Sequence, residues 1–402
     1  KKPSKTKAAK KDARSPKPAK ASPWTGNALL IGARATLLLF VLGLGYAVAA
    51  ADVFYSEAEQ RMHILPRFIF FLLAQAAATE LFVVLMLQVG RRICGETAPS
   101  TCEPTREEMA VHDSRIPWPP SDLLSSELRA FATKTGQPFF LNHVTGRQRC
   151  KDACMRVGMN LASSLVVCCT CLWMDKRSLT SLGLPMSKEL LVDSGLGFLV
   201  GVGIVFFILV VELLAGWVRF LRLFEVFDRS ESFARCIFWD VVFHLNVALN
   251  EELPLRGWML HNLADAFAAH LGARPLMAFS LAVLAESGFF VAMHLRSPGG
   301  SRLQSMVNIF VGGVAAGLNV MFTGGRLGFA LGWHFGWNIS MGNVFGLSTS
   351  GIPISATFIS VVPHPEKRAE HGGEFGPEGG LVAPAAYGLG VLLLRLIYGM
   401  PR

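Results

Sequence analysis

The chain has 402 residues, of which 51% are hydrophobic and 17% are charged. An ordinary soluble domain carries about 25% charged residues, so this composition excludes a typical soluble globular protein and indicates a multi-pass membrane protein. The formal net charge is +9, but residues 1–23 alone contain nine Lys or Arg and one Asp, which leaves the rest of the chain nearly neutral.

The N-terminal tail, residues 1–28, is rich in Lys, Ala, Pro and Ser and has no apolar period, which predicts disorder. A solvated tail, a targeting segment, and a contact with anionic lipid or nucleic acid are all compatible with it. No nucleic acid is expected as a partner of the membrane part. Because the tail is basic and almost free of acids, it favours an organellar membrane, mitochondrial or plastid, over the endoplasmic reticulum.

Apolar segments of about 20 residues predict an all-α integral membrane protein, a polytopic bundle of about eight or nine transmembrane helices with a small extramembrane insertion. Two spans fall in 29–90, two with their connecting loop in 157–235, and the others form a C-terminal core, 236–398. The individual predicted spans are 29–51, 64–90, 157–174, 195–218, 236–271, 276–294, 306–323, 327–345 and 381–398.

Two pairs of glycines within these spans have the small-xxx-small spacing that allows helices to approach closely. The pairs are Gly197 with Gly201 and Gly313 with Gly317. We therefore expect tight helix contacts at both places.

The polar loop 91–156 is the sizeable extramembrane segment that the sequence predicts. Within it, residues 128–150 are similar to a WW domain, since Thr135 to His143 resembles the second and third strands of that small sheet. Leu128 and Cys150 stand where the two signature Trp residues would be, which argues against binding of proline-rich ligands. A degenerate structural module and an unrelated loop are both possible, and either offers a site for a protein partner.

The eight cysteines do not predict a disulfide framework in a chain of this size. Three of them lie in an apolar span, where Cys behaves as a small hydrophobic residue. Four others offer thiols for zinc, but their spacing matches common zinc patterns poorly, and no metal site is expected. These four are Cys94, Cys102, Cys150 and Cys154.

The first of three polar clusters in the apolar C-terminal helices contains Glu251, Glu252 and Arg256. A charge in such a helix costs roughly 2.5–3.5 kcal/mol even on the lenient insertion scale. Glu252 and Arg256 are four residues apart and can pair, whereas Glu251 points about 100° away. An unpaired carboxylate at low dielectric suits general-base catalysis, although the three residues could also simply mark a helix end near the interface.

The second and third clusters place Phe290 one turn before His294 and His334 one turn before Asn338. The imidazole and the amide of the third cluster can both donate hydrogen bonds to a developing oxyanion. Taken alone, each cluster also fits a polar contact inside a helix bundle. Together the three clusters supply a base, a group that orients water, and two oxyanion donors, which is the set needed to hydrolyse an acyl bond.

These clusters resemble the EExxxR, FxxxH and HxxxN motifs of the CPBP family, the type II CAAX-protease and bacteriocin-processing intramembrane glutamic proteases. The resemblance covers roughly residues 236–398, and the stretch Gly373 to Glu378 is also similar to family sequences. It implies a membrane endopeptidase without a cofactor that cleaves a peptide bond near the membrane surface. In the roles it implies, Glu251 and His294 activate water, Glu252, Arg256 and Phe290 support them, and His334 and Asn338 stabilise the oxyanion.

Pro254 lies inside the first motif, where it removes a helical hydrogen bond and is expected to kink the helix. Two alternative functions are a noncatalytic membrane scaffold or assembly subunit and a metal-dependent hydrolase with Glu251, His294 and His334 as ligands. The expected partners are membrane lipid and a membrane-associated peptide or protein substrate, with or without a prenyl group.

Overall fold

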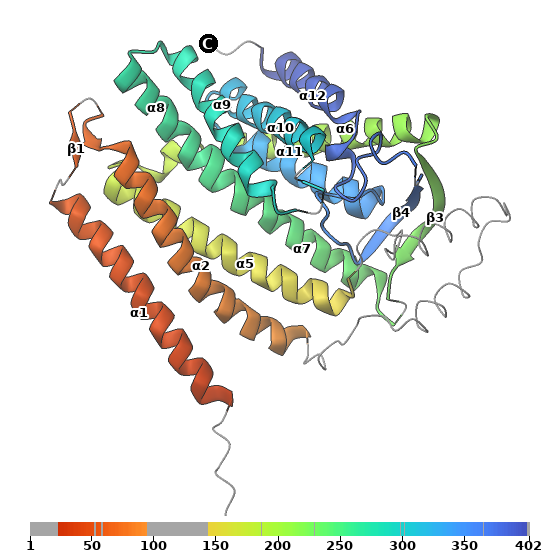
Figure 1. The fold of residues 1–402 in the computed structure, drawn as a ribbon, viewed down its shortest axis with the longest axis horizontal. Coiled ribbons are helices and arrows are strands. Elements are labelled where there is room, and N and C mark those ends of the chain that lie inside the picture. The colour runs from red at the N-terminus through yellow and green to blue at the C-terminus, as the bar shows by residue number, and fades with distance from the viewer. Residues whose placement is uncertain are drawn as a thin grey trace, which may run out of the picture.

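The computed structural model describes residues 23–399 apart from 52–53, 58, 95–143, 186, 229, 298, 301 and 365. The basic tail up to residue 22 and most of the WW-like segment therefore lie outside the described residues. Helices make up most of the described chain and lie side by side in one bundle (Figure 1). This arrangement confirms the predicted helical polytopic fold.

The N-terminal part of the bundle consists of α1 (Pro23–Ala50), α2 (Ile64–Cys94) and α5 (Gly146–Cys169). A short antiparallel hairpin of β1 (Tyr55–Ser56) and β2 (Arg61–Met62) connects α1 to α2. In Figure 1, α1 lies at the outer edge of the bundle, and α2 and α5 follow it toward the centre.

The remaining described helices form the C-terminal part of the bundle, and three helices of the described chain continue into π-helical turns. The long helices are α6 (Lys188–Leu214), α7 (Phe233–Glu252), α8 (Leu260–Leu271), α9 (Pro275–His294), α10 (Leu303–Phe322), α11 (Gly328–Ile339) and α12 (Ala383–Tyr398). The π-helical turns are η1 (Thr170–Met174), η3 (Leu253–Met259) and η4 (Ser340–Val344), and the 3-10 turns are η2 (Leu179–Leu182) and η5 (Pro377–Gly379).

A second antiparallel sheet lies at one edge of the bundle and was not predicted from the sequence. It pairs β3 (Val218–Val226) with β4 (Ala356–Pro363), two segments far apart in the chain. Val218 lies opposite Pro363. The pairing ties the segment after α6 to the segment after η4, next to the end of the helix that carries His334 and Asn338 (Figure 1).

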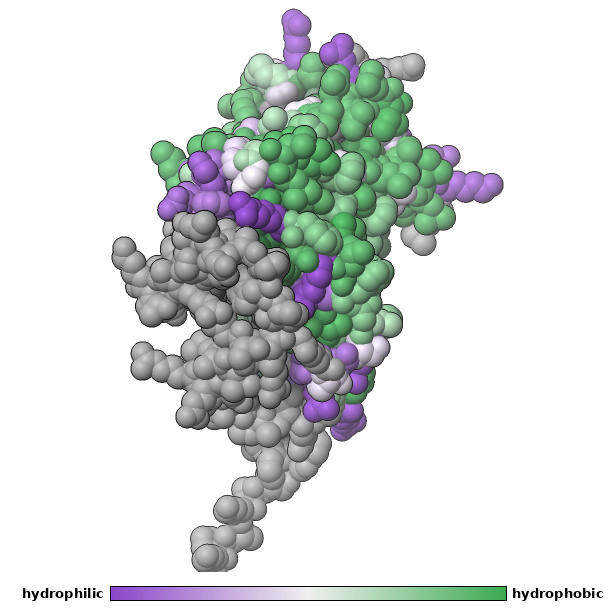
Figure 2. All heavy atoms as spheres, turned by 90° about the vertical axis from the view of Figure 1, so that its right-hand side faces the viewer, coloured by the Kyte–Doolittle hydropathy of each residue, from purple (hydrophilic) through white to green (hydrophobic). Residues whose placement is uncertain are grey.

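The surface of the bundle is apolar. Six described helices are long and apolar enough to cross a membrane, and large hydrophobic side chains project from them, with Leu39 70% and Leu214 85% exposed. Figure 2 shows the side of the molecule that lies at the right of Figure 1, and apolar residues cover most of its described surface. Exposure of such an apolar surface to water is unfavourable, whereas contact with lipid is not. The protein is therefore an integral multi-pass membrane protein.

Both predicted glycine contacts are confirmed, and they hold two helices of the core in place. Gly197 and Gly201 bring α6 against the backbone of α11, where a Cβ on Gly201 would lie 2.6 Å from the carbonyl oxygen of Trp333. Gly313 and Gly317 bring α10 against the side chains of Ser287 and Val283 on α9. Side chains on α9 and α11 are therefore carried by closely packed helices.

The boundary of the extramembrane loop is corrected by the structure. Helix α5 begins at Gly146, capped by the side chain of Thr145, so the loop ends about ten residues earlier than predicted and Cys150 is helical. The WW-like resemblance therefore does not extend through residue 150. In addition, Cys94 and Cys150 form a disulfide, because packing of α2 on α5 brings together two thiols that are 56 residues apart in sequence.

Candidate active site

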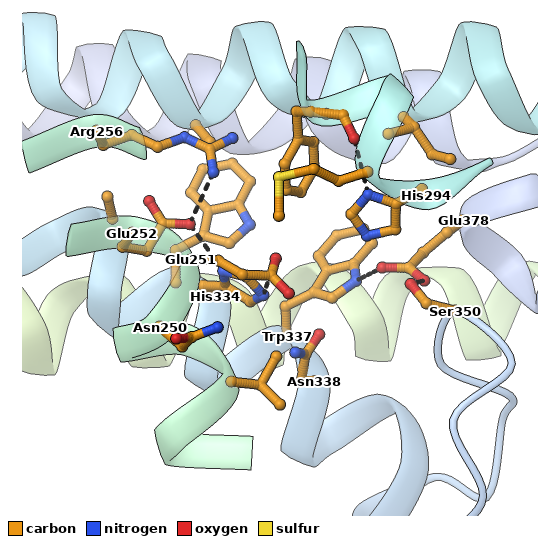
Figure 3. A pocket seen from close by; sticks show the side chains of 18 of the residues that line it. Asn250, Glu251, Glu252, Arg256, His294, His334, Trp337, Asn338, Ser350 and Glu378 are labelled. Atoms are coloured by element: carbon orange, nitrogen blue, oxygen red, sulfur yellow. Dashed lines mark hydrogen bonds and ion pairs between the residues drawn. The ribbon is translucent and has the colours of Figure 1, made fainter. Parts of the chain in front are cut away.

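A cavity of about 290 Å³ lies among α5, α7, α9, α10, α11 and the start of α12 (Figure 3). Every residue of the three polar clusters lines it, although the clusters lie on three separate helical segments. These residues are Glu251, Glu252, Arg256, Phe290, His294, His334 and Asn338.

Glu252 is the residue that joins the first cluster to the third. Its Oε1 accepts a hydrogen bond from Arg256 at 3.2 Å and another from Nδ1 of His334 at 2.7 Å. All three groups are largely withdrawn from solvent, and a carboxylate can only accept, so Nδ1 of His334 carries the hydrogen. The second nitrogen of the ring, Nε2, is left to face the cavity.

Glu251 lies beside this network without belonging to its hydrogen bonds. Its Oε2 is 3.9 Å from Nε2 of His334, which is too long for a hydrogen bond. Its side chain keeps 14% of its surface exposed, compared with 2% for Glu252. The two adjacent carboxylates are thus divided into one that is paired and buried and one that faces the cavity.

His294 lies on the opposite side of the cavity from Arg256 (Figure 3). Its Nδ1 is 2.9 Å from the carbonyl oxygen of Phe290, and because a carbonyl only accepts, Nδ1 donates its hydrogen there. In the neutral ring, Nε2 is then an acceptor. No hydrogen bond or ion pair between Glu251 and His294 is found among the described residues, so any joint action of the two would run through a bound water.

Asn338 lies one turn after His334 on α11 and is 4% exposed. Its side-chain amide makes no hydrogen bond with a described residue, so it is available to a ligand. The neighbouring Trp337 donates from Nε1 to Glu378 at 3.0 Å and stacks on Tyr387, which closes this end of the cavity. The tryptophans that flank the third motif therefore form part of its wall.

Residues 233–340 match the family of type II CAAX prenyl endopeptidase Rce1-like proteins. Over these residues the chain is similar to the Rce1-like family. The match runs from the start of α7 to the first residue of η4, so it contains all three polar clusters and agrees with the CPBP resemblance. It supports a CAAX-protease-like membrane endopeptidase. No curated protein and no solved structure matches the chain.

The segment that matches the Rce1-like model also contains a buried acid that the sequence analysis missed. Glu286 lies on α9 one turn before Phe290, is 0% exposed, and has its Oε1 3.5 Å from Nε of Arg256. Neither of its carboxylate oxygens accepts a hydrogen bond from a described residue. The rule that selected Glu251, a charged residue in an apolar helix, would have selected Glu286 as well.

Glu378 is a further carboxylate of the cavity, contributed by η5 beyond the Rce1-like match. It accepts hydrogen bonds from Trp337 and, at 2.5 Å, from the hydroxyl of Ser350. The sequence analysis noted the stretch that contains Glu378 but assigned it no role. The signal was weak because η5 is separated from the three polar clusters in sequence and approaches them only through the fold.

The predicted disturbance at Pro254 takes the form of a π-helical turn. The α-helical pattern ends at Glu252, continues as η3 through Pro254 and Arg256, and resumes in α8. Pro254 cannot donate a backbone hydrogen bond, and π-helical turns often occur at functional sites. The turn leaves Glu252 and Arg256 paired, so the proline does not break the first motif.

The metal-dependent alternative requires three ligand atoms that lie close to one another. Among the described residues, Glu59, His63 and His270 bring three metal-ligating atoms within 4.8 Å of one another. Cys94, Cys150 and Cys154 are equally close, but the disulfide between Cys94 and Cys150 leaves only Cys154 with a thiol. The three cavity residues proposed as ligands, Glu251, His294 and His334, do not form such a group.

Proposed function

We propose that the protein is an intramembrane glutamic endopeptidase that hydrolyses a peptide bond at or near the membrane surface. Its substrate is a membrane-associated peptide or protein, with or without a prenyl group. The observation that carries the proposal is the division of the adjacent carboxylates: Glu252 is held by Arg256 and His334, while Glu251 faces the cavity.

In this mechanism Glu251 is the general base. It removes a proton from a water bound between itself and Nε2 of His294, and the hydroxide attacks the carbonyl carbon of the scissile bond. When the carbon–nitrogen bond breaks, Glu251 returns the proton to the departing amine. The products are a carboxylic acid and an amine, and no covalent enzyme intermediate forms.

His334 and Asn338 stabilise the oxyanion of the tetrahedral intermediate. Both project from one face of α11 into the cavity, and the Asn338 amide is free to donate. A protonated His334 donates from Nδ1 to Glu252 and from Nε2 to the oxyanion, so Glu252 and Arg256 act by fixing the orientation of the ring. Removing one oxyanion donor typically lowers kcat by about 10²–10³.

The test is cleavage of a panel of prenylated and unprenylated peptides by the full chain reconstituted in lipid. Glu251→Gln should abolish cleavage, whereas Glu189→Gln, the same chemical change at an exposed acid near the start of α6, should retain it. Cleavage should also survive a chelator. A chelator-sensitive activity that follows a bound metal would favour the metal-dependent hydrolase, and a biological phenotype unaffected by Glu251→Gln would favour the scaffold.

A further inference from the structure

Two arginines on α5 lie close to the ring of Phe243, but only one of them forms an ion pair with a described residue. The guanidinium of Arg149 lies 4.1 Å from the ring centre of Phe243, and that of Arg156 lies 5.2 Å from it. Arg149 is 1% exposed and pairs with Asp240 at 2.5 Å. Arg156 makes no ion pair with any described residue, and its buried Nε has no hydrogen-bond partner there. Asp152, one turn before Arg156 on α5, interacts with it electrostatically, but no ion pair joins the two side chains.

Arg156 also lines the catalytic cavity, which Arg149 does not. The other charged groups of the cavity wall, apart from Glu251, are engaged: Arg256 pairs with Glu252, and Glu378 accepts from Trp337 and Ser350. An unpaired guanidinium beside a partly desolvated cavity is costly, and a planar anion that can accept two parallel hydrogen bonds would relieve that cost.

The cavity favours a carboxylate over a larger anion. Its volume of about 290 Å³ is at the lower end for ligand sites, which admits a chain end or one side chain with its neighbouring peptide bond. Glu251 and Glu378 lie in the same wall and would repel a doubly charged phosphate more strongly than a singly charged carboxylate. A peptide substrate provides such a carboxylate at its C-terminus or on Asp and Glu.

We propose that Arg156 forms a subsite of the active-site cavity that binds a carboxylate of the peptide substrate, either the free C-terminus or an acidic side chain near the scissile bond. The inference rests on the proposed peptidase function. It assigns substrate selection to α5, a helix that lies outside the Rce1-like match. Arg156 would fix the position of the substrate relative to Glu251 and take no part in the proton transfers.

The test compares peptides that differ in one carboxylate. One pair has the same sequence with a C-terminal acid or a C-terminal amide, and a second pair has Asp or Asn beside the scissile bond. Wild type should prefer the acid member of at least one pair by about tenfold to a hundredfold in kcat/KM, as expected for a charge-assisted hydrogen bond. The pair that shows the preference identifies which carboxylate is bound.

The readout for the variants is the acid-to-neutral ratio of kcat/KM. Arg156→Gln should bring the ratio close to one, and Arg156→Lys should give an intermediate ratio because it keeps the charge but loses the planar fork. Arg147→Gln, an exposed arginine on the same helix, should keep the wild-type ratio. If Arg156→Gln lowers both rates and leaves the ratio unchanged, Arg156 is structural and the subsite is wrong. A wild-type ratio of one for both pairs overturns it too.

A binding measurement separates this inference from the proposed function. Fluorescence anisotropy of labelled acid and neutral peptides on the Glu251→Gln protein does not require catalysis. Stronger binding of the acid peptide that depends on Arg156 supports the subsite even if no peptide in the panel is cleaved. Equal binding of both members, or binding of neither, overturns the subsite even if cleavage by wild type establishes the peptidase.

Discussion

Two buried ion networks lie in different parts of the molecule, and they differ in how completely their charges are satisfied. In the first, Arg67 of α2 donates to Asp175 at 2.8 Å, and the other oxygen of Asp175 accepts from Trp258 and Asn262. In the second, one oxygen of Glu252 takes both hydrogen bonds while the other has no described partner.

The difference indicates what each network does. Both carboxylate oxygens of Asp175 accept hydrogen bonds from protein donors, so the first network fastens the N-terminal helices to the core and leaves no oxygen of Asp175 for a ligand. The second network borders a cavity and leaves Glu251 and Asn338 open to it. Buried charge alone is therefore not a sign of an active site; buried charge with unused hydrogen-bonding capacity beside a cavity is the stronger indicator.

The largest effect on stability is expected from breaking the first network. Arg67→Ala leaves Asp175 buried without its cation, which should lower the free energy of unfolding by about 3–5 kcal/mol. Denaturation of the purified protein in detergent measures the change. The control is Arg34→Ala, which removes a more exposed pair with Glu80 and should cost less than about 1 kcal/mol. Equal losses in the two variants would contradict the structural role of the first network.

The disulfide makes a further link between α2 and α5. Cys94→Ser should lower the free energy of unfolding by about 2–4 kcal/mol, because the crosslink restricts the unfolded chain. Cys168→Ser, which changes a free cysteine of α5, the helix that carries Cys150, is the control and should have a smaller effect. A reductant should lower the stability of wild type to that of Cys94→Ser; a wild type insensitive to reductant would argue that the bond does not form.

Within the second network, Arg256→Lys should affect catalysis more than folding. Lysine keeps the positive charge but cannot reproduce the hydrogen-bonding fork, so the orientation of Glu252 and His334 is lost. We expect kcat to fall by about tenfold to a hundredfold. Arg326→Lys, at a 2.6 Å pair with Asp193 away from the cavity, should leave kcat near the wild-type value. A similar loss in both variants would argue against a specific role of Arg256.

Of these variants, Glu286→Gln should change stability and kcat the least. Its carboxylate has no hydrogen-bond donor among the described residues, so a neutral amide should leave the fold as stable as wild type or more stable. Because Glu286 helps to position Arg256, kcat should fall by up to about tenfold. Steady-state kinetics should show this fall with little change in KM. An increase in KM alone would place Glu286 in substrate binding instead.

The sequence predicted interactions that depend on spacing along one helix. Glu252 pairs with Arg256 because four residues bring two side chains onto one helix face. Gly201 packs against α11 because its spacing from Gly197 creates a flat surface for a neighbouring helix. Such local rules also placed His334 and Asn338 on one face. That the three clusters act together was inferred from their combined chemistry and from the family resemblance, because no local rule brings three separate helices to one cavity.

Contacts between segments that are far apart in the chain could not be predicted from the sequence. Arg67 and Asp175 are separated by 108 residues, and no local pattern distinguishes this pair from other charges near helix ends. The pairing of β3 with β4 joins segments that read as loops, since each strand gains its hydrogen bonds only from the other. Arg156 lies in a stretch that the sequence assigned to an extramembrane loop, so its place in the cavity could not be anticipated.

The most direct test measures cleavage rate per folded molecule together with unfolding stability in Glu251→Gln and Arg67→Ala. We predict that Glu251→Gln loses about 10²–10⁴ in kcat and keeps its stability, because it removes the general base and leaves the hydrogen bonds of Glu252 with Arg256 and His334 in place. Arg67→Ala should lose stability and keep its rate per folded molecule. A Glu251→Gln protein that cleaves substrate at the wild-type rate would contradict the assignment of the cavity as the active site.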